Sequence, residues 1–196
     1  MNNIIPYINI HTHQKRENEI SIECVGVHPY EVESGERLSA DDILPSTQAV
    51  GEIGLDFSRP ISKQLQEELF EEQLSLAQDA GLPVVIHSVK SFERVMEILK
   101  KFSLKAVIFH GFIGSYEQAQ RAVERGCFLS FGHRCFNSSK TLNALRKLQL
   151  NNIFFETDDY DISIEDIYLK ASELRTENIE QIKAELYKNY KKIFNK

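Results

Sequence analysis

Short apolar runs rich in β-branched and aromatic residues alternate along the chain with stretches that are apolar on one face only. Seven of these runs have the length of strands, and apolar residues recur every three or four positions in the stretches between them. The alternation is typical of an α/β fold built on parallel strands. The predicted strands cover roughly residues 7–11, 20–27, 47–53, 83–87, 106–110, 127–131 and 153–156.

The clearest predicted helix covers residues 62–80. Its apolar residues fall on one helical face, Gly81 follows in the position of a helix stop, and Pro83 opens the next strand. The order of elements therefore repeats strand and helix, as parallel strands require. Further helices are predicted over residues 90–101, 115–125 and 138–148, and two more between about 163 and 194.

Length and composition predict one domain over residues 1–196. A chain of 196 residues with 42% hydrophobic content can form one well-buried core, and no Gly/Ser/Pro-rich linker or sequence repeat divides it. No run of about 18 apolar residues would span a membrane, and residues 1–16 lack the basic and long apolar regions of a secretion signal. We therefore expect a cytosolic protein that does not bind a membrane.

Charge and cysteine content narrow the function classes. The formal net charge of −6 argues against a broad basic surface for nucleic acid, although it leaves room for a locally basic cleft. Cys24, Cys127 and Cys135 are odd in number and lack CxxC spacing, so they predict neither a disulfide framework nor a zinc–thiolate site. Packing is the role that we expect for them.

Histidines gather where the predicted strands end. His11 and His13 stand one residue apart, so alternation along a strand points both rings to the same face. In parallel α/β sheets and barrels, ligands bind at the carboxyl ends of the strands. Two carboxylates, Glu52 and Asp158, fall at such predicted ends as well. The six histidines that follow predicted strands are His11, His13, His28, His87, His110 and His133.

Taken singly, each of these residues is weak evidence, because a histidine at a strand end is more often an ordinary hydrogen-bonded residue than a ligand. Together the imidazoles and carboxylates make a set suited to zinc or manganese, and to magnesium if water completes the coordination. The set is larger than one open catalytic site needs, so it predicts one or two divalent ions.

The same residues occur in an order that resembles the TatD-like metal-dependent hydrolases of the amidohydrolase superfamily, which are barrel enzymes with nuclease activity. GEIGLD at residues 51–56 matches the family unaltered, and the resemblance runs through nearly the whole chain. The first motif alone is less specific, because HxH is shared with other phosphoesterases. The other matching segments are NIHTH (9–13), GVHP (26–29), Gln66 with Gln73, AGLPVVIHS (80–88), FHGF (109–112), ETD (156–158) and Asn189 with Phe194.

The resemblance implies a set of metal ligands and a reaction. Glu52 would bridge two ions or serve the first together with His11, His13 and Asp158, whereas His87 and His110 would hold the second. A water whose pKa is lowered by the metal would attack a phosphodiester phosphorus or a carbonyl carbon, with Asp158 accepting its proton. Asp158 and Glu52 are thus the implied catalytic residues, and His28 would contact phosphate or support a ligand. The implied ligands are His11, His13, Glu52, His87, His110 and Asp158.

Several positions depart from the family pattern. Asn9 replaces the Asp that opens the first motif, which turns a charged partner of the metal ligands into a neutral amide. Val89 stands where an Arg is frequent, Gly111 replaces a Cys, and Asp159-Tyr160 replace the residues that lead to a Pro. We therefore expect altered metal affinity, and the substrate preference is not inherited from the family.

The chain is unusually short between His13 and Gly26. Only 12 residues separate them, too few for the helix, strand and helix that the resemblance implies there. The predicted fold is therefore an α/β, TIM-like (β/α) barrel of the metal-dependent hydrolase type, abbreviated to about seven strands. The place of the usual second strand is expected to be missing or filled by irregular chain.

Basic residues after several predicted strands favour a phosphate-bearing substrate, although basic loop residues are commonly just solvated. Lys15 and Arg16 follow the first strand in the same way. The predicted substrate-binding residues are His28, Arg59, Lys90 and Arg134. Aromatic residues that either stack on bases or pack are Tyr30, Phe57, Phe112, Phe136 and Tyr160.

Three functions fit these patterns. The first is a divalent-metal phosphodiesterase, a deoxyribonuclease acting on strand ends, with DNA or a small phosphodiester as its partner. The second places the same metal chemistry on a small amide or ester. The third is a catalytically weakened homologue that binds metal or a partner without turnover. Retention of all six implied ligands favours an enzyme that uses one or two ions of magnesium, manganese or zinc. The sequence patterns do not indicate whether the protein is a monomer or an oligomer.

Overall fold

The computed structural model describes residues 5–194. The chain divides into two compact units, which are described separately. The terminal unit combines Met1–Ile22 with His110–Lys196, and the central unit is Glu23–Phe109. Residues 1–4 and 195–196 of the predicted domain lie outside the described part of the chain. No helix among residues 5–194 has the length and apolar composition that crossing a bilayer requires.

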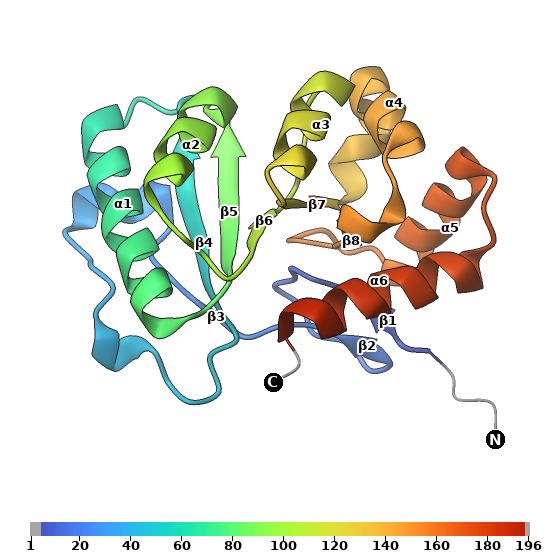
Figure 1. Cartoon of the computed structure of the whole chain (residues 1–196), viewed down its shortest axis with the longest axis horizontal. Helices are drawn as coiled ribbons and strands as arrows, with labels where there is room; N and C mark the ends of the chain where they lie inside the picture. Colours follow the sequence, from blue (N-terminus) through green and yellow to red (C-terminus); the bar gives the residue numbers. More distant parts are fainter. Residues whose placement is uncertain (1–4, 195–196) are drawn as a thin grey trace. The chain divides into compact units, whose positions relative to one another are not determined.

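Four parallel strands form the sheet of the central unit, in the order β3-β4-β5-β6 (Figure 1). Strand β4 is almost completely buried along its length, which is typical of a parallel strand covered on both faces. Gly54 is required in it, because a Cβ there would lie 2.0 Å from the carbonyl oxygen of His87. The strands are β3 (Cys24–Val25), β4 (Ala49–Asp56), β5 (Val84–Val89) and β6 (Val107–Phe109).

Helix α1 (Lys63–Ala80) packs against β4 and begins and ends where the sequence predicts. The Ser62 hydroxyl accepts the backbone N–H of Leu65 at the start, and Gly81 adopts the left-handed conformation at the end, with φ of 64°. The remaining helical segments of this unit are η1 (Pro29–Ser34), η2 (Ala40–Asp42), α2 (Phe92–Ile98) and η3 (Leu99–Lys101).

Two buried glutamines on α1 bind backbone groups of the central unit. Gln73 accepts the N–H of Val27 at 2.7 Å and donates to its carbonyl oxygen at 3.0 Å. Gln66 binds the N–H and carbonyl of Asp56 in the same way, at 2.8 and 3.1 Å. Each glutamine therefore pairs with a buried backbone N–H and a buried backbone carbonyl that have no partner within the sheet. Through these bonds α1 holds the chain next to His28 and at the end of β4.

The terminal unit contains two pairs of parallel strands, β1 with β2 and β7 with β8. The pairs join where the N–H of Ile10 donates to the carbonyl of Phe155 at 3.0 Å and where Thr12 bridges Asp158 in parallel fashion. Residues 10–12 therefore run beside the end of β8. The strands are β1 (Tyr7–Ile8), β2 (Glu19–Ile20), β7 (Phe128–Phe131) and β8 (Ile153–Phe155).

Paired helices surround these strands, with α3 beside α4 and α5 beside α6 (Figure 1). Tyr168 of α5 is fully buried, and its hydroxyl accepts the N–H of Ile8 and donates to the Ile8 carbonyl. Asn189 of α6 donates to the carbonyls of Leu150 and Ile153. The helical segments are α3 (Tyr116–Glu124), η4 (His133–Asn137), α4 (Ser139–Lys147), η5 (Leu150–Asn152), α5 (Ile164–Arg175) and α6 (Ile179–Phe194).

The predicted strand at 20–27 is wrong in one respect. It consists of two strands, β2 paired with β1 and β3 paired with β4, so the described residues contain eight strands rather than about seven. A continuous apolar run cannot reveal that its two halves pair with different partners. Between β1 and β2 the described chain is irregular, as the short spacing predicts, but β2 itself is present.

Candidate metal centre

His11, His13 and Asp158 come together at the ends of β1 and β8 in the terminal unit. The Nε2 atoms of both histidines lie 3.6 Å from Oδ1 of Asp158. Backbone bonds fix the arrangement, since His13 donates its N–H to the Asp158 carbonyl at 3.0 Å and Asp158 donates to His11 at 3.1 Å. Asp158 has a φ of 56°, a left-handed conformation that Asp adopts more readily than most residues. Both rings converge on Asp158, although the predicted strand over residues 7–11 is shorter than expected, because β1 ends at Ile8 before either histidine.

His110 and Glu156 extend this group. The rings of His110 and His11 lie 4.5 Å apart between centroids, and His110 Nδ1 is 3.4 Å from Glu156 Oε1. The same carboxylate oxygen accepts the N–H of Gly111 at 2.6 Å. Burial alone would raise the pKa of Glu156, but the hydrogen bond and charge of His110, with the charge of His11, outweigh it and lower the pKa.

The donor set fits a divalent ion. One candidate atom from each of His11, His13 and Asp158 lies within 4.8 Å of the others, and the same holds for His110, Glu156 and Asp158. Imidazole and carboxylate ligands suit zinc and manganese. Oε2 of the fully buried Glu156 has no hydrogen-bond partner among the described residues, an environment that a cation would stabilise.

A second group forms in the central unit from His28, Glu52 and His87. Oε1 of Glu52 lies 2.7 Å from His87 Nδ1 and 3.2 Å from His28 Nε2, and one candidate atom from each residue lies within 4.8 Å of the others. His28 Nδ1 accepts the N–H of Tyr30 at the start of η1, at 3.2 Å. The other ring nitrogen, Nε2, faces Glu52.

Asp56 supports this second group from the end of β4. Its Oδ2 lies 3.3 Å from His87 Nε2 and accepts the Tyr30 hydroxyl at 2.8 Å, while Oδ1 accepts the N–H and hydroxyl of Ser58. Burial would raise the pKa of Asp56, but these bonds from Ser58, Tyr30 and His87 lower it. The two carboxylates, Glu52 and Asp56, thus face the two nitrogens of one imidazole.

The predicted positions of several site residues differ from those in the structure. It predicts Glu52 at a strand end, but β4 continues to Asp56, so Glu52 lies inside the strand. It predicts that His28 contacts phosphate or supports a ligand, and the ring lies in the group with Glu52 and His87. Glu156 and Asp56 are not among the predicted site residues. For Glu156 a signal existed, because it opens the ETD segment at 156–158 that the sequence analysis matched to the family.

The predicted substrate-binding residues differ in their surroundings. The guanidinium of Arg59 lies over the Tyr30 ring, 4.4 Å from its centroid, and Lys90 is exposed after β5. Arg134 is exposed too. Among the aromatic candidates, Tyr160 is 37% exposed, whereas Phe112 is only 5% exposed and packs in the core. These surroundings leave Arg59, Lys90 and Arg134 in reach of solvent.

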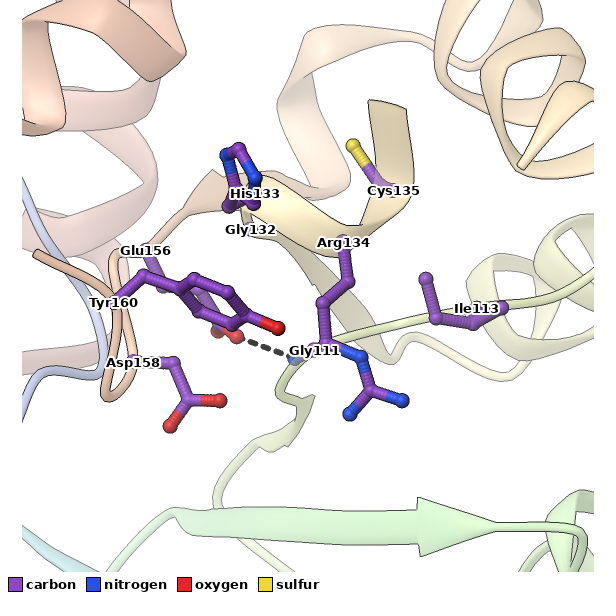
Figure 2. Close-up of a pocket in the computed structure, with 9 residues that line it drawn as sticks. All are labelled: Gly111, Ile113, Gly132, His133, Arg134, Cys135, Glu156, Asp158 and Tyr160. Carbon is purple, nitrogen blue, oxygen red and sulfur yellow. Dashed lines mark hydrogen bonds between the residues drawn. The ribbon is translucent and has the colours of Figure 1, made fainter. Parts of the chain in front are cut away.

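A pocket in the terminal unit adjoins Asp158 and Glu156. The rings of His133 and Tyr160 lie 4.9 Å apart at an angle of 36° on its wall. In Figure 2 the carboxylate of Asp158 and the guanidinium of Arg134 point to the same side of the pocket. The pocket is lined by Gly111, Ile113, Gly132, His133, Arg134, Cys135, Glu156, Asp158 and Tyr160.

Comparison with known proteins gives consistent matches. Residues 7–195 match the family described as TatD related DNase. The chain is 30% identical to the uncharacterized metal-dependent hydrolase YjjV of Escherichia coli K12, over 88% of this chain and 76% of that protein. It is 31% identical to the 3'-5' ssDNA/RNA exonuclease TatD of Citrobacter rodentium, over 78% of this chain and 62% of that protein.

Solved structures show the same fold. The crystal structure of E. coli YjjV superposes with a TM-score of 0.82 and 26% identity, covering 98% of this chain and 87% of that chain. A TatD family hydrolase from Entamoeba histolytica superposes with a TM-score of 0.78 at 18% identity, over 91% of this chain and 76% of that chain. The predicted fold class, a TIM-like (β/α) barrel, is confirmed by these likenesses.

Proposed function

Because the chain belongs to the TatD related DNase family, we propose that it is a divalent-metal-dependent phosphodiesterase that acts on the end of a nucleic-acid strand. Membership confirms the predicted family and the predicted class of metal-dependent hydrolase. The observation that carries the proposal is the convergence of His11, His13, His110 and Asp158 on one region of the terminal unit.

We assign the ion-holding role to the two described groups. In the terminal unit, His11, His13 and Asp158 would hold a divalent ion, with His110 beside them. In the central unit, the Glu52 and His87 side chains would hold a divalent ion, with His28 in contact. Manganese and zinc suit these donors best, and magnesium suits them if water completes its coordination. When bound, such an ion acts as a Lewis acid and lowers the pKa of water.

The protein's own residues would bind the phosphodiester and move the proton. The carboxylate of Asp158 lies beside His11 and His13, so we assign Asp158 as the residue that accepts the proton of the attacking water. Arg134, which points to the same side of the pocket as Asp158 (Figure 2), would bind the phosphate of the terminal nucleotide. Arg59, Lys90 and His28 remain the candidates for phosphate contacts in the central unit.

A metal and nuclease assay tests the proposal. The untagged protein, the double variant His110→Ala/Asp158→Ala and the surface control Lys140→Ala would be compared for metal content by elemental analysis. Each would then receive single-stranded DNA labelled at its 5′ or 3′ end, with Mn²⁺ or Mg²⁺. We expect near-stoichiometric metal and cleavage from one end in the wild type and in the control, with both lost in the double variant.

Other outcomes would overturn the proposal. Turnover of small amides or esters without DNA cleavage would mean an amidohydrolase. A protein that holds no divalent ion and gains no activity from any would mean a binding homologue without turnover. Both outcomes are measured on the same protein preparations. The double variant shows whether His110 and Asp158 are responsible for any metal binding and activity of the wild type.

We further propose that residues 1–196 function as one domain in the cytosol. The family match over residues 7–195 includes both the terminal and the central unit, which supports one functional domain.

A further inference from the structure

We propose that Asn9 and Glu19 are a pair of positioning residues for the group of His11, His13 and Asp158, an inference that rests on the proposed role of that group in holding metal. Asn9 follows β1 and is fully buried, and Glu19 lies on β2. Neither residue is among the metal-ligand candidates. Their hydrogen bonds lead to the backbone that carries these candidates.

The Asn9 amide uses all of its principal hydrogen-bonding groups. Its Nδ2 donates to Oε1 of Glu19 at 3.0 Å and to Oγ1 of Thr157 at 2.9 Å. Its Oδ1 accepts the backbone N–H of Thr157 at 3.0 Å. A buried amide with two donors and one acceptor engaged has a single orientation, so the side chain acts as a rigid link.

The link continues to the residue between the two histidines. The Thr157 hydroxyl donates to Oγ1 of Thr12 at 2.9 Å, and the Thr12 hydroxyl donates to the carbonyl of Gln14 at 3.0 Å. Thr157 directly precedes Asp158, and Thr12 stands between His11 and His13. The chain of bonds from Glu19 through Asn9 and Thr157 to Thr12 therefore connects both strands whose ends carry the candidate ligands.

The direction of these bonds decides which side chain suits each position. Each threonine hydroxyl donates once and accepts at least once, so the chain needs a donor at position 9 and an acceptor at position 19. A carboxylate at position 9 would remove both donors and place a second negative charge next to Glu19 in a buried site. Asn9 and Glu19 are thus complementary, and exchanging amide and carboxylate between them would restore the bond between the two side chains but not the bond from position 9 to Thr157.

The short strand β2 brings Glu19 to this position. Tyr7 and Ile8 of β1 pair with Glu19 and Ile20, and the N–H of Asn9 donates to the Ile20 carbonyl at 2.9 Å. Oε1 of Glu19 also accepts the N–H of Arg16 at 3.4 Å. Two paired residues are enough to position the Glu19 carboxylate. The short segment between His13 and Gly26 therefore does more than connect β1 to β3.

A double-mutant cycle tests the pairing with Asn9→Asp, Glu19→Gln and the double variant. Glu17→Gln is the matched control, because Glu17 is exposed in the same segment and receives the same chemical change. Each protein would be unfolded in urea without metal and titrated with Mn²⁺ by calorimetry. We expect Asn9→Asp to weaken Mn²⁺ binding about 10–100-fold and Glu19→Gln to weaken it less, since a glutamine oxygen can still accept the amide.

The double variant carries the decision. We expect its Mn²⁺ affinity and its urea midpoint to rise above those of Asn9→Asp, because the new amide at position 19 can donate to the new carboxylate at position 9. Both stay below the wild-type values, because the donor to Thr157 is still missing. Effects that simply add in both measurements would overturn the pairing. If the wild type itself binds no Mn²⁺, the proposed function fails, whereas the urea cycle and the NMR resonances of the His11 and His13 rings still decide whether the pair positions them.

Discussion

The orientation of a buried polar side chain in this protein is fixed by the hydrogen-bond partners of its polar atoms. Glu156 illustrates this, because one oxygen accepts the N–H of Gly111 and faces His110, while the other has no hydrogen-bond partner in the described part of the chain. A buried carboxylate oriented by a backbone N–H has few alternative positions. It can therefore hold His110 in one orientation and present a negative charge to an ion at the same time.

Replacing Glu156 with Gln removes that charge without changing the shape of the side chain. We expect Mn²⁺ affinity to fall about 10–100-fold, as for other residues that orient metal ligands. Calorimetric titration measures the change, with Glu173→Gln on the exposed face of α5 as the control. Unchanged Mn²⁺ affinity in Glu156→Gln would show that this carboxylate supports only the fold.

The three thiols differ in burial, and we expect them to differ in reactivity for that reason. Burial raises the pKa of Cys127 to about 11 and that of Cys135 to about 12, so both stay protonated and inaccessible near neutral pH. Cys24 is only partly buried. We expect one thiol to react with a disulfide reagent at pH 8 in the native protein and three in urea. Cys24→Ser should abolish the native reaction, and a native reaction that survives this change would contradict the burial of the other two.

Helix α1 contributes more than packing, because its polar side chains complete the hydrogen bonds of neighbouring segments. Gln66 and Gln73 lie on its buried face, about two turns from each other, and bind the backbone at Asp56 and Val27. An amphipathic helix thus carries polar residues on its buried face at the points where backbone groups near the ends of the strands need hydrogen-bond partners.

Gln73→Met tests this role at nearly constant volume. The change leaves the N–H and carbonyl of Val27 buried without partners, so we expect a loss of roughly 2–4 kcal/mol in the free energy of unfolding. Urea unfolding followed by circular dichroism measures it. Gln64→Met, on the exposed face of the same helix, should cost less than about 0.5 kcal/mol. Equal costs for both variants would remove the special role of Gln73.

For the chain as a whole, metal binding and stability are linked. An ion that binds only the folded state stabilises it by an amount that grows with its concentration, about 2.7 kcal/mol at a hundred times the dissociation constant. We expect Mn²⁺ to raise the melting temperature and EDTA to reverse the rise. His110→Ala/Asp158→Ala should show no rise, and a rise of the same size in that variant would place the ion elsewhere.

Much of the fold could be predicted because its signals are local. The extent of α1 follows from helical periodicity and its end from Gly81, both within one short segment. The spacing of His11 and His13, one residue apart, predicted that their rings converge, and both lie 3.6 Å from Asp158. The ordered motifs, above all GEIGLD at 51–56, predicted the family that the comparison with known proteins confirms. These features depend on residues that are close together in the chain, so the sequence alone is enough to predict them.

Other features depend on contacts between residues far apart in the chain, which only the tertiary structure decides. The apolar run at 20–27 divides into β2 and β3 because its halves pair with different strands. Asn9, read from the sequence as a lost charge, binds a carboxylate from Glu19 and the backbone of Thr157, 148 residues away. Hydrogen-bond partners are chosen by proximity in space, so the supporting residues of the site emerge only when the strands are assembled.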